Sequence, residues 1–114
     1  MMERPEAFVQ APSLHLMDRF PAALLELRDN GQIAHFNLAW VELMDRPGPE
    51  RNLIDYVHHE DRSLWRQALH ELRRRPETSF SQRLRFVHPS GELRWFDVSL
   101  KRETQGFYLV AGDI

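Results

Sequence analysis

Residues 80–100 read FSQRLRFVHPSGELRWFDVSL, two runs of alternating apolar and polar side chains with a turn signal between them. A period of two places successive side chains on opposite faces of a β-strand. The turn signal is Pro89-Ser90-Gly91, where glycine can adopt the positive φ that a tight reversal needs. The apolar residues that share one face are Phe80, Leu84, Phe86, Phe96, Val98 and Leu100. The stretch therefore predicts a β-hairpin with one face on a hydrophobic core.

Trp95 falls on the opposite face of this hairpin, together with Arg83, Arg85 and Asp97. A tryptophan side chain has a large apolar surface, and leaving that surface in water on a polar sheet face is unfavourable. We therefore expect either another element of the chain or a partner to cover Trp95.

The composition is typical of a single soluble domain. At 114 residues the chain can build one core, with residues 1–20 as a lead-in and short cap helix and residues 21–114 as the domain. A net charge of −2 gives no basic surface for nucleic acid, and no apolar run is long enough to span a membrane. The absence of cysteine excludes disulfides, cysteine nucleophiles and a flavin–cysteinyl adduct. We expect a cytoplasmic protein.

The rest of the chain predicts strands and helices in separate groups. Ser13 can cap a short helix that Pro21 ends, and this helix is too short to be stable alone. The other predicted elements are strands 23–28 and 32–36, a helix over 38–44, one helical turn within 52–57, a longer helix opening at 58–61 and running to about residue 75, the hairpin, and a last strand over 107–112. Such segregation predicts an α+β fold with an antiparallel sheet.

Four motifs in this order make the chain similar to a PAS domain with its carboxyl-terminal PAC part. They are DNGQI (29–33) with NLAW (37–40), LIDYVHHEDR (53–62), SGELRWFDVS (90–99) and AGDI (111–114). His59 stands where the family usually has proline, and Ser90 replaces the usual aspartate. The resemblance covers roughly residues 20 to 114.

The resemblance implies a five-stranded antiparallel sheet in the order 2-1-5-4-3, with short helices and one longer helix on one face. It also implies a module of a bacterial-type signalling protein that senses a small molecule or mediates dimerisation. Such a module relays a signal to a carboxyl-terminal effector domain, here a histidine kinase, a cyclic-dinucleotide enzyme or a transcription regulator. Asp113 would lie at the signal output. Because the chain stops directly after a strand, we expect it to continue in the full-length protein.

The densest polar cluster is His58-His59-Glu60-Asp61. A metal site would use both histidines and a carboxylate, but adjacent histidines at a helix start point in different directions. The alternative is that His58 caps the long helix while Glu60 and Asp61 lie at its positive end. We favour capping.

No cofactor is expected. Haem-binding members of the family use a histidine from the long helix, and His70 is the only one well inside it. At about 100° per residue, His70 lies roughly 170° from the apolar stripe that contains Trp65 and Leu69, so we expect it to face solvent. Non-covalent flavin binding is not excluded by the sequence.

A ligand pocket, if present, would lie between the sheet and the helices. The residues that could line it are Trp40, Met44, Tyr56 and Phe86, which could equally be plain core. His35 and His88 could contribute from strands or be partly exposed. The alternative function of a different class is a small acid–base enzyme with Asp97 as its base. An exposed Asp97 would argue against that function.

The outer sheet face is the expected partner surface. We predict a homodimer in which Leu14, Met17 and Phe20 of the amino-terminal helix and Trp95 of the hairpin are buried between two copies. In the monomeric alternative, the same helix covers Trp95 within one chain. A purely structural dimerisation module without a ligand is the main alternative to a sensor.

Overall fold

The computed structural model describes residues 20–114. Its elements are β1 (Ala23–Arg28), β2 (Ile33–Phe36), α2 (Leu38–Met44), the 3-10 turns η1 (Leu53–Asp55) and η2 (His59–Asp61), α3 (Arg62–Arg74), β3 (Ser79–Val87), β4 (Leu93–Arg102) and β5 (Gly106–Asp113). Every element predicted from the sequence after residue 20 is present, with small changes at the ends. The predicted cap helix, with Leu14 and Met17, lies outside the described residues.

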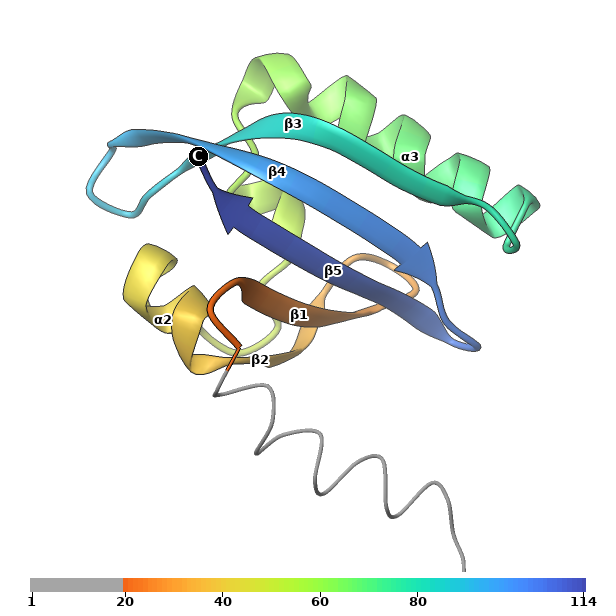
Figure 1. Ribbon diagram of the computed structural model, residues 1–114, viewed down its shortest axis with the longest axis horizontal. Helices are drawn as coiled ribbons and strands as arrows, with labels where there is room; N and C mark the ends of the chain where they lie inside the picture. Colours follow the sequence, from red (N-terminus) through yellow and green to blue (C-terminus); the bar gives the residue numbers. More distant parts are fainter. Residues whose placement is uncertain (1–19) are drawn as a thin grey trace, which may run out of the picture.

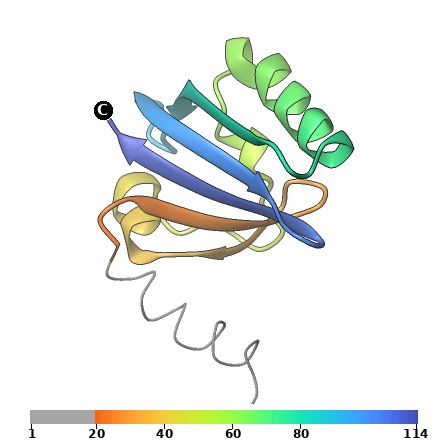
Figure 2. The ribbon, with the colours of Figure 1, turned by 45° about the vertical axis from the view of Figure 1, so that its right-hand side comes forward.

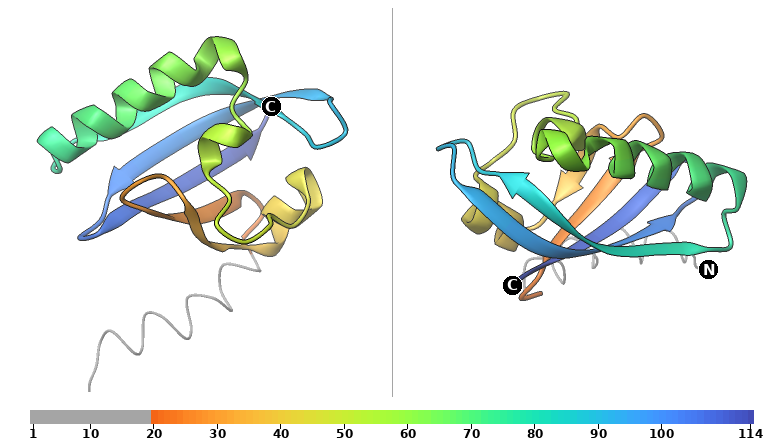
Figure 3. Two further views of the ribbon diagram at one scale, coloured as in Figure 1. Left: turned by 180° about the vertical axis from the view of Figure 1, so that it is seen from behind. Right: turned by 90° about the horizontal axis from the view of Figure 1, so that it is seen from above.

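The strands form one antiparallel sheet in the order β2-β1-β5-β4-β3 (Figures 1 and 2), which confirms the predicted topology. Both α-helices cover the same face of the sheet, as Figure 3 shows from behind. The other face, which we call the outer face, carries no helix among residues 20–114. Strands β2 and β3 are the two edges.

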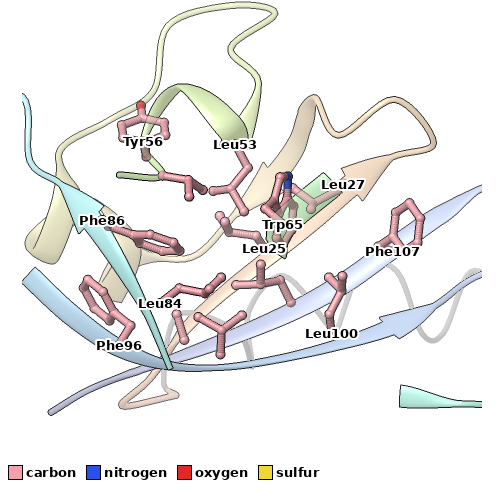
Figure 4. Packing of buried hydrophobic residues seen from close by; sticks show 14 of the residues in the cluster. Leu25, Leu27, Leu53, Tyr56, Trp65, Leu84, Phe86, Phe96, Leu100 and Phe107 are labelled. Atoms are coloured by element: carbon pink, nitrogen blue, oxygen red, sulfur yellow. The ribbon is translucent and has the colours of Figure 1, made fainter. Parts of the chain in front are cut away.

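The core lies between the sheet and the helices (Figure 4). The alternation predicted for the hairpin is confirmed, because Leu84, Phe86, Phe96, Val98 and Leu100 are at most 1% exposed. Trp65 and Leu69 of α3 are buried against this face, while His70 is exposed. Burying a side chain of the size of leucine stabilises the fold by about 1.5 to 3 kcal/mol, and a tryptophan buries more area, so these residues fix α3 to the sheet.

Asn37 joins the start of α2 to the start of β1. Its side-chain oxygen accepts the backbone N–H of Trp40 at 3.2 Å and that of Leu24 at 2.9 Å, and its amide donates to the carbonyl of Ala22 at 2.9 Å. The asparagine side chain is 1% exposed and thus satisfies backbone groups on two elements at once. Asn37 is therefore the N-cap of α2, and it also positions Trp40 within the core.

The start of the long helix differs from the prediction. The chain makes the 3-10 turn η2 first, and α3 begins only at Arg62. The His58 side chain accepts the N–H of Glu60 at 3.2 Å, which confirms a capping role, but for the 3-10 turn. We expected the Asp61 carboxylate to act at the positive end of the helix, but its main contact lies elsewhere. Its carboxylate makes no cap bond and instead binds Arg85 on β3, at 2.8 Å from Nη2 to Oδ1.

Candidate functional site

The structure brings the residues predicted to line a pocket into the core on the helix side of the sheet. Trp40 from α2 meets Tyr56 edge-on, with ring centroids 5.2 Å apart, and meets Phe86 from β3 at 6.0 Å. These three residues and Met44 are at most 3% exposed. Burial raises the pKa of the Tyr56 phenol, so it stays neutral and keeps its proton for hydrogen bonding.

Two polar atoms in this core have no hydrogen-bond partner. They are the indole nitrogens Nε1 of Trp40 and Trp65, both buried. Tryptophan donates one hydrogen bond through this N–H, and leaving a buried donor unpaired costs about 1 to 3 kcal/mol. Native cores rarely leave such groups unpaired. Trp40 and Trp65 therefore each keep one unused hydrogen-bond donor in the core.

The outer face carries exposed apolar side chains among charged ones. Trp95 is 48% exposed, and exposed apolar side chains accompany it on or beside this face: Phe20, Leu93, Tyr108, Val110 and Ile114. A shallow hollow of about 510 Å³ is lined by Arg83, Leu93, Arg94, Trp95, Asp113 and Ile114. The structure thus places Asp113 beside Trp95, and residues 20–114 leave the Trp95 ring half in water.

Among residues 20–114, the rings of His58 and His59 lie with their centroids 4.3 Å apart, whereas we expected these two side chains to point in different directions. His70 is exposed, as predicted, and therefore has no geometry for binding a buried iron. His35 is exposed and its Nδ1 pairs with Glu26, while His88 lies at the hairpin turn with Nε2 3.6 Å from a carboxylate oxygen of Asp45. Among residues 20–114, no group of three histidine or carboxylate side chains could hold a metal ion.

Asp97 cannot serve as the buried base of an enzyme. Its side chain is 66% exposed and pairs with Arg83, whose Nε lies 3.2 Å from Oδ1. A base for proton transfer needs a cleft that excludes water around the substrate. The candidate for the acid–base alternative is therefore removed.

Sequence reasoning missed two features of the site. Trp65 was assigned only to the apolar stripe of the helix, although an indole in a core always carries a donor. The pairing of Asp61 with Arg85 was also missed. Two opposite charges 24 residues apart carry no local periodicity, so the sequence gives no signal for that contact.

A five-stranded antiparallel sheet in the order 2-1-5-4-3, with helices on one face and an aromatic core between the layers, defines a two-layer α+β domain. The family model for the PAS fold matches residues 30–102, and the chain belongs to the PAS family. No curated protein matches the chain. Within residues 20–114, no helix has the length and apolar character needed to cross a membrane.

Solved structures of PAS domains share this fold. A domain of a sensory box sensor histidine kinase/response regulator from Geobacter sulfurreducens has a TM-score of 0.81 at 10% identity and covers 96% of this chain and 98% of its own. A PAS domain from Colwellia psychrerythraea has a TM-score of 0.78 at 13% identity, covering 93% and 97%.

The PAS domain of the quorum-sensing receptor RpfR from Cronobacter turicensis, in complex with BDSF, has a TM-score of 0.72 at 17% identity, covering 83% and 95%. The same domain is also solved in complex with C12:0. At such identities these similarities show the fold alone.

Proposed function

We propose that this PAS domain senses a small molecule bound between the sheet and the helices and relays its binding to an effector domain. The observation that carries the proposal is the pair of buried indole N–H groups of Trp40 and Trp65, neither of which has an acceptor. A ligand that supplies acceptor oxygens there would provide hydrogen-bond partners for these two donors.

The surroundings favour a ligand with an apolar body and an acceptor at one end. Apart from the two indole nitrogens and the phenol of Tyr56, the side chains of the buried core cluster are hydrocarbon or thioether. A carboxylate accepts several hydrogen bonds, and an acyl chain suits the apolar walls. The complexes of the RpfR PAS domain with BDSF and C12:0 support fatty acids as the first compounds to test.

Titration with dodecanoic acid, a C12:0 fatty acid, tests this proposal. Dodecanoic acid should raise the melting temperature of the full chain in a concentration-dependent way, because a ligand that binds only the folded state stabilises it. Dodecylamine has the same chain length but is protonated at neutral pH and offers no acceptor, so it should stabilise less.

Variants then locate the binding site. Trp40→Phe and Trp65→Phe each remove one N–H donor and should weaken binding of dodecanoic acid, whereas Trp95→Phe on the outer face should leave it unchanged. Equal stabilisation by both compounds, or weakening only by Trp95→Phe, would overturn the proposed interior site.

A second function, dimerisation, is supported by the half-exposed Trp95 ring and the apolar residues around it. We propose that two copies pair through this outer face and through Leu14, Met17 and Phe20, removing about 1,200 to 2,000 Å² from water in total. Sedimentation of the full chain tests the pairing, with Trp95→Glu as the variant that should produce monomers. A full chain that stays monomeric at high micromolar concentration would instead leave the amino-terminal segment to cover Trp95 within one molecule.

We propose that Asp113 belongs to the output end of the domain. Its exposed side chain lies next to Trp95 at the hollow, where β5 ends. In the full-length protein, Asp113→Ala should change signal output while ligand affinity and fold stay intact; a lost ligand or an unchanged output would contradict this role.

The solved domains from sensor kinases support an effector of the two-component type. A cysteine-free chain suits a reducing compartment, which supports a cytoplasmic location.

A further inference from the structure

The Arg85 side chain contacts both Trp95 on the outer face and the segment that begins α3. It lies on the edge strand β3, directly across from Trp95 on β4. Its guanidinium carbon is 5.1 Å from the centroid of the Trp95 ring, within the range of a cation–π contact. A guanidinium on the ring restricts the orientations that the indole can adopt.

The same guanidinium is bound by the segment that leads into α3. Nε and Nη2 donate to the two carboxylate oxygens of Asp61 at 3.1 and 2.8 Å, and Nη1 donates to Glu60 at 3.1 Å. The Asp61 side chain is only 13% exposed and that of Arg85 22%, so water screens this pair poorly. Arg85 also holds the pKa of the Asp61 carboxyl below its usual range, which keeps Asp61 ionised and the fork geometry in place.

Backbone contacts fix this segment to the edge of the sheet. The N–H of Arg85 donates to Asp61 Oδ2 at 2.8 Å, and its carbonyl accepts the N–H of His58 at 2.8 Å. The next contact along the edge joins the N–H of Val87 to the carbonyl of Tyr56 at 2.7 Å. The segment before α3 and Tyr56 of the aromatic core are therefore both hydrogen-bonded to β3, the strand that carries Arg85.

We infer that Arg85 is a positioning residue that couples the start of α3 to the orientation of Trp95 on the outer face. Asp61 directly precedes α3, and Trp65, whose indole N–H faces no acceptor, follows one turn later. A shift of this helix start displaces the Asp61 carboxylate, and the bidentate pair transmits the displacement around the sheet edge to the Trp95 ring. This inference rests on the proposed function, which places the ligand beside α3 and the partner on the outer face.

Arg83 provides a matched control. It lies two residues earlier on the same strand and the same face, and it also pairs with a carboxylate, that of Asp97. However, both members of that pair are 66% exposed, and neither belongs to the α3 segment. A change at Arg83 removes a surface ion pair near Trp95 without interrupting the link to the helix.

The test is a double-mutant cycle on the full chain, read by ¹⁵N NMR of the indole N–H signals. The chain has three tryptophans, and Trp95→Phe assigns the signal of Trp95. Asp61→Asn should shift this signal when Arg85 is present and leave it in place in the Arg85→Gln background. In the Arg83→Gln background, Asp61→Asn should shift it as in the parent chain.

Dispersed signals of Trp40 and Trp65 show that each variant is folded. If Asp61→Asn does not fold, Asp61→Glu replaces it, since one added methylene moves the carboxylate while keeping its charge. An equal shift of the Trp95 signal with and without Arg85, or no shift in the parent chain, would overturn the inference.

Titration with dodecanoic acid separates failure of this inference from failure of the proposed function. Shifts of the Trp40 and Trp65 signals report interior binding, and a shift of the Trp95 signal reports transmission. Interior shifts with an unchanged Trp95 signal in the parent chain would overturn the coupling alone. If no signal shifts, the proposed ligand class is wrong, and the cycle at Asp61 still decides the role of Arg85.

Discussion

Replacing Trp65 by alanine should lower the free energy of unfolding by about 3 to 5 kcal/mol. Trp65 is 1% exposed and lies between α3 and the sheet (Figure 4). Burial of a large aromatic side chain removes up to about 250 Å² from water, which at about 25 cal/mol per Å² stabilises the fold by about 6 kcal/mol. The indole N–H has no acceptor, and its lost hydration offsets about 1 to 3 kcal/mol of that gain. The remainder agrees with the range measured for truncating a buried tryptophan.

The assay is equilibrium unfolding in urea, with the midpoint and slope compared between variants. Leu69→Ala, one turn further along the same buried stripe, should cost about 2 to 5 kcal/mol. His70→Ala on the exposed side of the helix is the matched control and should change stability by less than about 0.5 kcal/mol. Trp65→Phe keeps most of the ring and removes the unpaired donor, so it should cost clearly less than Trp65→Ala.

Midpoints that hardly move for both Trp65→Ala and Leu69→Ala would show that this face of α3 does not carry the core. A loss for Trp65→Phe as large as that for Trp65→Ala would show that the indole N–H does have an acceptor in the folded chain.

Three further results are expected. The Arg85 guanidinium lowers the pKa of Asp61 in the folded state. The pair therefore stabilises the fold above the unfolded-state pKa of about 4, and this contribution is lost as the pH falls through the folded-state pKa. Urea midpoints should fall more steeply below about pH 4 in the parent chain than in Asp61→Asn. Gly106→Ala should lower the melting temperature well beyond Gly112→Ala, because a Cβ at Gly106 would lie 2.0 Å from the carbonyl oxygen of Leu27 while one at Gly112 meets nothing within 4 Å; equal melting temperatures would contradict this. Freshly purified protein should show no visible chromophore, and a Soret band or stoichiometric flavin absorption would refute that expectation.

The positions of the strands and the inward face of the hairpin could be predicted because both follow from local patterns. Alternation along residues 80–100 assigned Phe86 and Phe96 to the core, and helical spacing directed His70 outward. The turns were also local signals, since Gly31 and Gly91 take positive φ at the two predicted reversals. The order of the strands came from the family resemblance and is confirmed by the structure.

The candidate site could be predicted only in part. The sequence predicts that Trp40, Tyr56 and Phe86 lie between the sheet and the helices, and these aromatic residues do meet there. Whether an indole N–H in that layer finds an acceptor depends on every side chain that surrounds it. The sequence could not show that Trp40 and Trp65 lack one, because those neighbours come from distant segments.

By itself the sequence determined which residues form the strands and helices and which face of each is apolar, because period and turn chemistry act over a few neighbouring residues. Only the tertiary structure decided the partners of the polar groups. Asp61, expected at a helix end, instead binds an arginine 24 residues away on an edge strand. Such a pair forms because folding brings two charges together in a partly buried site, where water screens them less than on an open surface, and no local pattern in the sequence records that meeting.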